Sequence, residues 1–261
     1  MRKKAMGVPI SACVMTFNEE QNIRRCLESL TWCDEIIVLD SFSTDNTVPI
    51  CREYTARVHQ HEWLGYISQR NLVKDMATHD WVLFLDADEE VSPQLREALI
   101  KRFENRPKGC VGFEFPRLVF YLGKWIRHGT WYPDYKIRLF LKEMGRSGGV
   151  EPHDTVQLDG PSIRLREPIW HYTYKDVADH VNTMNRFSSI SAQTMHDCGR
   201  HFRWMDLLFR PAWRFFKGFV FRNGWLDGWR GFMIDLINAF GVAMKYIKLR
   251  ELDWQARQRQ E

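Results

Sequence analysis

The sequence lacks several patterns that would place it in a specialised class. Its six cysteines form no C-x-x-C pair and several fall in apolar runs, which argues against a zinc knuckle or a disulfide framework and favours a reducing compartment. The basic N-terminus runs directly into a strand-length segment, without the apolar region and cleavage site of a secretory signal. There is no internal repeat and no low-complexity segment. We therefore expect a globular protein that stays in the cytoplasm.

Long hydrophobic runs are also missing. The longest apolar stretch, residues 236–244, is interrupted by Asn238 and falls well short of the roughly 20 residues that a membrane-spanning helix needs. The sequence therefore predicts no transmembrane helix.

Net charge is small, at +4, but the charged residues are unevenly placed. From Gly199 to the end there are twelve Arg and Lys against six Asp and Glu, interleaved with Trp and Phe. Such helices suit a membrane interface, where aromatic rings sit at the headgroups and cations meet anionic lipid. Packing on the protein core or a dimer contact is the alternative. We predict peripheral attachment of the C-terminal helices to the inner face of the cell membrane.

The N-terminal part alternates short apolar runs with helical patterns, as βαβ units with a mainly parallel sheet do. The spacing predicts strands over residues 10–15, 35–39, 57–61 and 81–85, and helices over 19–30, 43–54, 67–77 and 92–103. Residues 111–171 are β-rich and irregular, and the chain beyond Tyr174 is helical, with segments at 204–217 and 232–249. The fold class expected is α/β with a C-terminal amphipathic helical extension.

Two carboxylates follow the fourth predicted strand, at Asp86 and Asp88. In an extended segment they point to the same side, so both can reach one hard cation such as Mg²⁺ or Mn²⁺ at the carboxyl end of the strand. Such a cation would neutralise charge that develops on a departing diphosphate. The same residues could instead begin an acidic first turn of a helix. The tripeptide alone leaves both interpretations open.

Polar loops also follow the first two predicted strands, at residues 15–20 and 38–47, and Arg70 adds a cation that could pair with diphosphate oxygens. Three strand ends with polar loops are where a nucleotide would lie in an open α/β sheet. Taken singly, Asn18 and Asp45 could be helix caps and Arg70 a solvated helix residue.

Together, residues 16–20, 40–45, 70–71 and 86–88 resemble a family 2 glycosyltransferase with the GT-A fold, which is Rossmann-like. Residues 129–134, 138–140 and 153–154 further resemble the WaaE/KdtX subgroup of that family, which builds bacterial lipopolysaccharide core. The resemblance implies a GT-A domain over residues 1–175, with a nucleotide-sugar half at 1–103 and an acceptor half at 104–175. Residues 176–261 would then form a helical, membrane-associating extension.

The resemblance also implies roles for individual residues. Asp86 would lie near the ribose and the metal, and Asp88 would be the main ligand of Mg²⁺ or Mn²⁺. Because members of the family invert the anomeric centre, a base should deprotonate the acceptor hydroxyl. Asp154 is the first candidate for that base and Asp134 the second. The nucleotide sugar would be held by the strand-end residues Thr16, Asn18, Glu19, Asp40, Asp45 and Arg70.

His171, between Trp170 and Tyr172, could be a further metal ligand, as in several GT-A enzymes, or a histidine packed among aromatic rings. Imidazole generally prefers softer metals than Mg²⁺, which counts against the first interpretation.

The function expected is transfer of one sugar from a nucleotide-diphosphate donor to a lipid-linked cell-envelope saccharide. Polyisoprenyl phosphate is an alternative acceptor, and because it is already anionic it would need no base. A noncatalytic protein that binds membrane or nucleic acid through its basic aromatic tail is a third possibility. It leaves the N-terminal motifs unexplained, so we expect no nucleic-acid partner.

Overall fold

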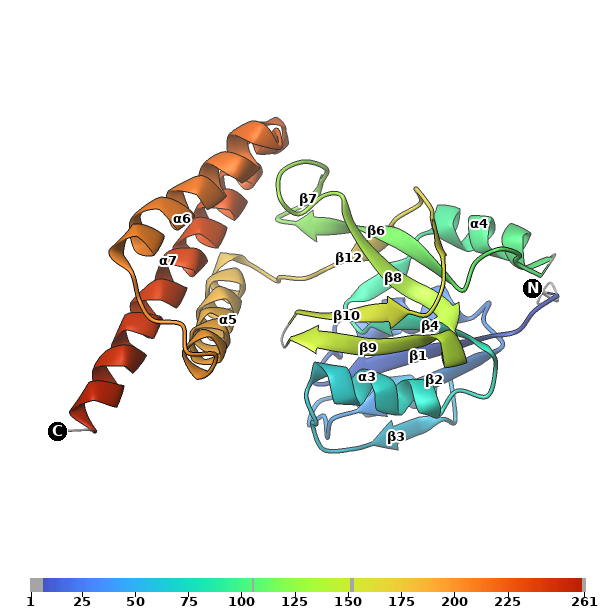
Figure 1. Ribbon diagram of the computed structural model, residues 1–261. Helices are drawn as coiled ribbons and strands as arrows, with labels where there is room; N and C mark the ends of the chain where they lie inside the picture. Colours follow the sequence, from blue (N-terminus) through green and yellow to red (C-terminus); the bar gives the residue numbers. More distant parts are fainter. Residues whose placement is uncertain (1–6, 105, 151–152, 260–261) are drawn as a thin grey trace. The chain divides into compact units, whose positions relative to one another are not determined.

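The computed structural model describes residues 7–104, 106–150 and 153–259, except for the side chains of Val150, His153 and Asp154 (Figure 1). It divides into two compact units. The first comprises Met1–Leu118 and Asp134–Thr173, and the second comprises Val119–Pro133 and Tyr174–Glu261.

The first unit is built on a mixed sheet with the strand order β3-β2-β1-β4-β8-β6-β12-β5, with β11 paired to β6. Strands β3, β2, β1 and β4 are parallel, whereas β8 is antiparallel to both β4 and β6. A separate antiparallel pair is formed by β9 and β10. The strands are β1 (Ile10–Thr16), β2 (Glu35–Asp40), β3 (Val58–Gln60), β4 (Trp81–Asp86), β5 (Glu89–Val91), β6 (Gly112–Tyr121), β8 (Asp134–Leu141), β9 (Gly145–Val150), β10 (His153–Leu158), β11 (Ser162–Arg164) and β12 (Ile169–His171).

Helices cover both faces of the parallel strands, which explains why β1 and β4 read as continuous apolar runs. Residues of α1 and α4 join one buried cluster with alternate residues of β1, and α3 residues join a second cluster on the other face. In α1 the buried positions Ile23, Cys26, Leu27 and Leu30 follow the helical repeat. The helices of this unit are α1 (Ile23–Leu30), α2 (Thr47–Arg52), α3 (Tyr66–Asp75) and α4 (Pro93–Glu104), with a 3-10 turn η1 (Lys142–Met144).

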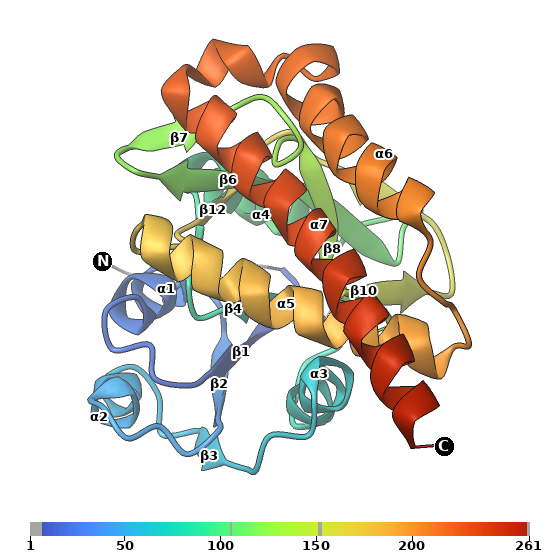
Figure 2. The same ribbon diagram turned by 90° about the vertical axis from the view of Figure 1, so that its left-hand side faces the viewer.

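The second unit is helical apart from β7 (Lys124–Ile126), which pairs with the end of β6. Its helices α5 and α6 both pack along α7 (Figure 2). The core between them includes Ala192, Tyr246 and Leu249. The elements are α5 (Val177–Asp197), α6 (Trp204–Phe216), the π-helical turn η2 (Lys217–Phe221), the 3-10 turn η3 (Gly224–Asp227) and α7 (Trp229–Gln258).

The strands and helices predicted from the sequence are confirmed, with most ends shifted by a few residues; the last helix, predicted to end at residue 249, runs to Gln258 as α7. Within the described residues, no helix combines the length and the hydropathy that crossing a bilayer requires. Two details differ from the expectation. Asn18 does not cap a helix: α1 begins at Ile23 with Asn22 at its N-cap, and Asn18 takes a left-handed conformation with φ of 54°. The segment Val119–Pro133, which contains the end of β6 and β7, groups with the C-terminal helices in the second unit.

Candidate active site

Three of the predicted site residues end neighbouring parallel strands. In the register of the sheet, Thr16 of β1 pairs with Asp40 of β2, and Met15 pairs with Asp86 of β4. The three polar side chains therefore stand at one edge of the sheet, where ligands bind in open α/β folds. The sequence order alone could not show this adjacency for β4, because β4 follows β3 in the chain but pairs with β1.

The loops after β1 and β2 are joined by side-chain hydrogen bonds. The backbone N–H of Asn18 donates to Oγ of Ser43 at 2.8 Å, and its own Oδ1 accepts from the N–H of Thr44 at 2.8 Å. The N–H of Glu19 donates to Oγ1 of Thr47 at 2.8 Å. Asparagine tolerates the left-handed backbone better than most residues, so Asn18 can turn the chain and bridge the loops at once. The two loops form one rigid rim at the sheet edge.

Asp45 belongs to the same rim. Its carboxylate accepts from the N–H of Thr47 at 2.9 Å and from the N–H of Glu20 at 3.2 Å. Burial alone would raise the pKa of Asp45, but these hydrogen bonds favour the ionised form and lower its pKa overall. The Asp45 side chain thus turns the loop toward α2 and ties it to the loop after β1.

Asp40 is fully buried and its carboxylate is held by the loop that follows it. Its Oδ2 accepts from the N–H of Ser43 at 2.9 Å and from Nε2 of Gln60 at 2.9 Å, and its Oδ1 accepts from the Ser43 hydroxyl. Beside it, Oγ1 of Thr16 is buried and has no hydrogen-bond partner among the residues that the structure describes. A buried polar atom without a partner is costly, so Thr16 is suited to receive a polar group of a ligand.

Asp86 is held between two arginines. Its Oδ1 accepts from Nη2 of Arg70 at 2.8 Å, and its Oδ2 accepts from Nη2 of Arg138 at 2.7 Å. Burial raises the pKa of Asp86, but the guanidinium groups of Arg138 and Arg70 outweigh it and hold that pKa well below its usual range. Asp86 is therefore a carboxylate whose ionisation and orientation are fixed by these arginines.

Glu89, which sequence reasoning did not single out, completes this network. It is buried, accepts from Arg138 Nη2 at 2.7 Å through Oε1, and accepts from the N–H of Asp86 at 3.1 Å through Oε2. Nη1 of Arg117 lies 3.6 Å from the same Oε1. Buried charges persist in proteins only when they are paired in this way. Glu89 and Arg138 thus lock the turn that carries Asp86.

Asp88 meets His171 across two short strands. Antiparallel pairing of β5 with β12 places His171 opposite Glu89, and the N–H of Tyr172 donates to the carbonyl of Asp88 at 2.9 Å. Nε2 of His171 then lies 3.0 Å from Oδ2 of Asp88. A carboxylate oxygen and an imidazole nitrogen are thereby brought together, with the carboxylate partly exposed at the edge of the sheet.

Asp134 stands among cations. Its Oδ2 accepts from Nε of Arg117 at 3.0 Å, and Nζ of Lys136 lies 3.3 Å from its Oδ1. Burial raises the pKa of Asp134, but Arg117 and Lys136 overcome this effect and lower it overall. A carboxylate with a lowered pKa is a weak proton acceptor, which makes Asp134 poorly suited to act as a general base.

Asp154, the first candidate for the base, lies outside the described side chains. Its backbone belongs to β10, where it pairs with Gly149 of β9. The β9 strand is fixed to α3 by Asn71, whose amide Nδ2 donates to the carbonyl of Ser147 at 3.0 Å and whose Oδ1 accepts from the N–H of Ser147 at 3.0 Å. The strand beside β10 is thereby anchored to the helix that carries Arg70.

Comparison with known proteins identifies the family. Residues 11–171 match the family described as Glycosyl transferase family 2. The chain belongs to this family. An uncharacterized glycosyltransferase of Rickettsia typhi is 32% identical over 260 residues, covering 95% of this chain and 89% of the relative. LpsC of Rhizobium meliloti, a lipopolysaccharide core biosynthesis glycosyltransferase, is 27% identical over 249 residues, covering 91% of this chain and 92% of LpsC.

Among solved structures, residues 1–349 of S. aureus TarS in complex with UDP-GlcNAc align over 96% of this chain and 92% of that chain, with 15% identity and a TM-score of 0.48. Membership of family 2 makes the protein a glycosyltransferase, and the predicted fold class, an α/β GT-A domain with a C-terminal helical extension, is confirmed.

In this family 2 glycosyltransferase, Asp88 and His171 could supply two of the ligands of a metal ion. Within the described residues there is no group of three or more His, Cys, Asp or Glu that could hold an ion by themselves. Mg²⁺ commonly takes one or two carboxylates and completes its shell with water and substrate phosphates, so a protein site of two donors fits a cation that arrives with a diphosphate. A histidine beside the carboxylate suits Mn²⁺ better than Mg²⁺.

Sequence reasoning missed the residues that hold Asp86 in place, namely Glu89, Arg138 and Arg117. Arg138 stood in a segment that resembled a glycosyltransferase subgroup, but no role followed from it. The contacts depend on antiparallel pairing of β8 with β4 and β6, which joins residues far apart in the chain. The sequence of β8 gives no sign of which carboxylate its arginine would meet.

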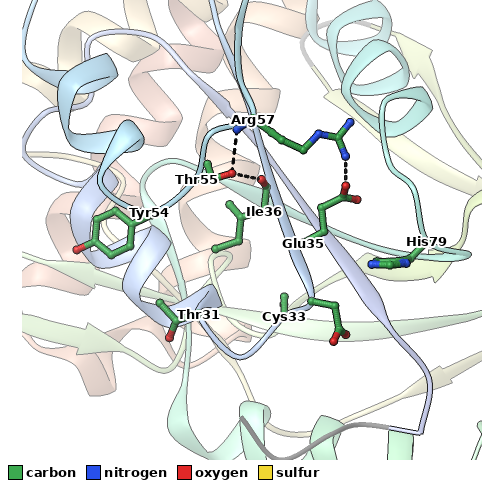
Figure 3. A pocket seen from close by; sticks show the side chains of 9 residues that line it. Thr31, Cys33, Glu35, Ile36, Tyr54, Thr55, Arg57 and His79 are labelled. Atoms are coloured by element: carbon green, nitrogen blue, oxygen red, sulfur yellow. Dashed lines mark hydrogen bonds and ion pairs between the residues drawn. The ribbon is translucent and has the colours of Figure 1, made fainter. Parts of the chain in front are cut away.

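A cavity of about 490 Å³ lies at the opposite edge of the sheet, where β2 begins (Figure 3). Arg57 and Glu35 form an ion pair there, and Oγ1 of Thr55 donates to the carbonyl of Ile36 at 2.8 Å. The Glu35 carboxylate also accepts from the N–H of Thr78 at 2.9 Å. These polar groups tie strands and helix ends to one another, and the cavity stands apart from the strand ends that carry Asp40 and Asp86.

Proposed function

We propose that the protein transfers a sugar, with inversion, from a nucleotide-diphosphate donor to a lipid-linked cell-envelope saccharide of the lipopolysaccharide core type. The observation that carries the proposal is the Asp88–His171 pair beside the fixed Asp86 carboxylate at the carboxyl end of β4. The site lies next to the polar strand ends of β1 and β2, where the nucleoside would be held.

The donor half of the proposal rests on the rim formed by the two joined loops. Thr16 offers a hydroxyl that has no hydrogen-bond partner in the described part of the chain, and Asp40 stands next to it in the register of the sheet. Asn18, Glu19 and Asp45 shape the rim through the hydrogen bonds described above. We assign them to the binding of the nucleotide sugar, because a rim that is already ordered costs little entropy when the ligand binds.

Asp88 and His171 would hold a divalent cation, Mn²⁺ or Mg²⁺, together with the diphosphate. When bound, the cation would act as a Lewis acid that neutralises charge on the departing diphosphate. Asp86 keeps its orientation through Arg70 and Arg138, so it can face the ribose and the metal without moving. In this arrangement Arg70 contributes to donor binding mainly by holding the Asp86 carboxylate in place.

Asp154 is the proposed base that takes the proton of the acceptor hydroxyl. Asp134 is the weaker candidate, since Arg117 and Lys136 keep it ionised and paired. The acceptor class is suggested by the likeness to LpsC, which acts in lipopolysaccharide core biosynthesis and matches nearly the whole chain.

Peripheral membrane contact through the C-terminal helices completes the proposal. Trp213, Phe216 and Phe221 are more than half exposed on α6 and η2, and further apolar side chains on α6 and α7 are exposed as well. Soluble proteins seldom leave so many large apolar side chains in water unless the surface meets a partner or a membrane. Aromatic side chains mixed with arginine and lysine match the interface of an anionic bilayer.

A donor screen tests the enzymatic part. The protein is incubated with UDP-, GDP-, ADP- and CMP-linked sugars, with Mn²⁺ or with a chelator, and release of the nucleotide is measured. We expect one nucleoside diphosphate sugar to be turned over in a metal-dependent reaction that speeds up when lipopolysaccharide core acceptors are added. Turnover that a chelator leaves unchanged would refute the proposed cation, and failure of every donor with every core acceptor would refute the proposed reaction.

The membrane part is tested separately by cosedimentation with vesicles that contain phosphatidylglycerol. The double variant Trp213→Ser and Phe221→Ser should sediment less than the wild type, whereas Trp63→Ser, on an exposed position of the first unit, should change nothing. Wild-type protein that stays in the supernatant at low salt would contradict membrane attachment.

A further inference from the structure

A second cavity, of about 420 Å³, lies in the helical unit at the turn between α5 and α6. Its charged lining consists of Arg200, His201, Arg203, Asp206 and Arg210. These residues lie on the turn before α6 and in the first two turns of α6, whose backbone is drawn in Figure 2. The cavity is therefore rimmed mainly by cations.

The charge of this cavity is only partly compensated. Asp206 is the single carboxylate among the lining residues that the structure describes, and it pairs with Arg210 and lies 3.7 Å from Nη2 of Arg200. The excess positive charge also affects Lys245 of α7. Burial lowers the pKa of Lys245, and the charges of Arg200 and Arg210 lower it further. Like charges gathered around a concave surface favour an anionic ligand.

The turn that carries these cations is fastened to α7. Asp253 is buried and accepts from the N–H of Phe202 at 2.8 Å, and its Oδ1 lies 2.9 Å from Nδ1 of His201. The cavity is thus formed before any ligand arrives, which reduces the entropy that binding would cost. The N-terminus of α6, a helix of 13 residues, adds the positive end of its dipole at Arg203.

Apolar side chains follow the cationic rim directly. Trp204, Met205 and Leu208, in the first turns of α6, are 66%, 64% and 64% exposed. A free phosphate or a sugar phosphate would gain nothing from these side chains. A phospholipid has its phosphate within a few ångströms of acyl chains, so it can satisfy the arginines and the apolar side chains at the same time.

We propose that this cavity is a binding site for the phosphate of an anionic phospholipid headgroup, held by Arg200, Arg203 and Arg210, with Trp204 and Leu208 inserted beside it. Guanidinium groups bind phosphate through paired, charge-assisted hydrogen bonds, which a diffuse surface charge does not provide. The site rests on the membrane attachment proposed above and gives it a defined contact.

The test compares two double variants that remove the same charge. Arg200→Gln with Arg203→Gln changes the cavity, whereas Arg257→Gln with Arg259→Gln changes exposed arginines of the C-terminal end that do not line it. Binding to phosphatidylcholine vesicles that contain phosphatidylglycerol is measured by sedimentation. We expect the cavity variant to lose about tenfold more affinity than the control variant, because directed hydrogen bonds to the phosphate add to the general attraction between cations and an anionic bilayer.

The other possible results would overturn different parts of the proposal. Equal losses in the two variants would overturn the headgroup site and leave membrane attachment standing, whereas no binding by the wild type would overturn the attachment itself. Soluble short-chain phosphatidylglycerol should raise the thermal unfolding midpoint of the wild type but not of the cavity variant. Inorganic phosphate that stabilises the wild type equally well would overturn the lipid as the source of the phosphate.

Discussion

Oδ2 of Asp88 lies 3.0 Å from Nε2 of His171, although 83 positions separate the two residues in the chain. Strand β5 follows the turn at the end of β4, and the short strand β12 pairs with β5. This pairing brings His171 next to Asp88. The acidic strand end alone would also be compatible with the first turn of a helix. The contact with His171 makes Asp88 one of two donors that a single cation can share.

The variant His171→Ala tests this pairing through the metal requirement. We expect the Mn²⁺ concentration that gives half-maximal donor turnover to rise by about tenfold or more, with turnover partly recovered at saturating metal, because one of two protein donors is lost. His79→Ala, at the opposite edge of the sheet, is the matched control. An unchanged metal requirement in His171→Ala would leave His171 as a packed histidine.

Removal of Arg138 tests the network around Asp86. The variant Arg138→Met leaves the carboxylates of Asp86 and Glu89 without their shared partner, so the free energy of unfolding should fall by about 3–5 kcal/mol. Arg164→Met breaks a pair with Glu114 in which the arginine side chain is 60% exposed, and it should cost at most about 1 kcal/mol. Urea unfolding of both variants makes the comparison. Similar losses would mean that the buried network contributes no more than a surface ion pair.

The two candidate bases are separated by their effect on transfer as opposed to donor hydrolysis. Asp154→Asn should abolish transfer to a hydroxyl acceptor while slow hydrolysis of the donor continues, whereas Asp134→Asn should weaken transfer less. Rates of sugar transfer and of nucleotide release are measured side by side. Transfer that survives both Asp154→Ala and Asp134→Ala would instead favour an acceptor that is already anionic, such as polyisoprenyl phosphate.

A buried aspartate in the helical unit gives a pH-dependent prediction. Burial raises the pKa of Asp235 from 3.8 to about 6, against the opposing influence of Arg214 and of a hydrogen bond from Thr130. The folded state therefore holds this proton more tightly than the unfolded state, so the contribution of Asp235 to stability is greatest below about pH 4 and is lost as the pH rises through 6. Well above pH 6, the loss of stability caused by the buried, ionised Asp235 no longer changes with pH.

Asp235→Asn should accordingly match the wild type near pH 4 and be more stable at pH 8. The amide has nearly the shape of the carboxylate, which matters because Gly218 and Gly224 approach it too closely to admit a Cβ. Asp227→Asn is the contrasting variant: its carboxylate accepts from the N–H groups of Arg127 and His128, so the substitution should destabilise at neutral pH. Thermal unfolding between pH 4 and pH 8 measures both. A stability difference between Asp235→Asn and the wild type that does not grow from pH 4 to pH 8 would contradict the prediction.

The sequence predicts the parallel half of the fold well because its signals are local. Strands β1, β2 and β4 are mostly apolar runs that end in polar loops, and the buried positions of α1 repeat with the helical period. The same local signals left the role of Asn18 open. Asparagine favours both helix N-caps and left-handed backbone, and only the bonds to Ser43 and Thr44 decide between them.

Long-range pairing set the limit of prediction in the candidate site. Asp86 and Asp88 were identified from their place after an apolar strand, but their different surroundings were not: the first is held by Arg70 and Arg138, and the second meets His171. Antiparallel pairing of β8 and β12 with partners far away in the chain creates these contacts. Long-range contacts also group Val119–Pro133 with the helices. One of them is the hydrogen bond that the N–H of Arg127 donates to Oδ2 of Asp227.

Donor turnover by the variant Asp88→Asn tests the central claim most directly. The change keeps the shape of the side chain but removes the charge that would bind the cation, so metal-dependent release of nucleotide from the best donor should be lost while thermal unfolding stays as in the wild type. Asp75→Asn, an exposed aspartate at the end of α3, should keep full turnover. Undiminished turnover in folded Asp88→Asn protein would contradict the assignment of this strand end as the metal and diphosphate site.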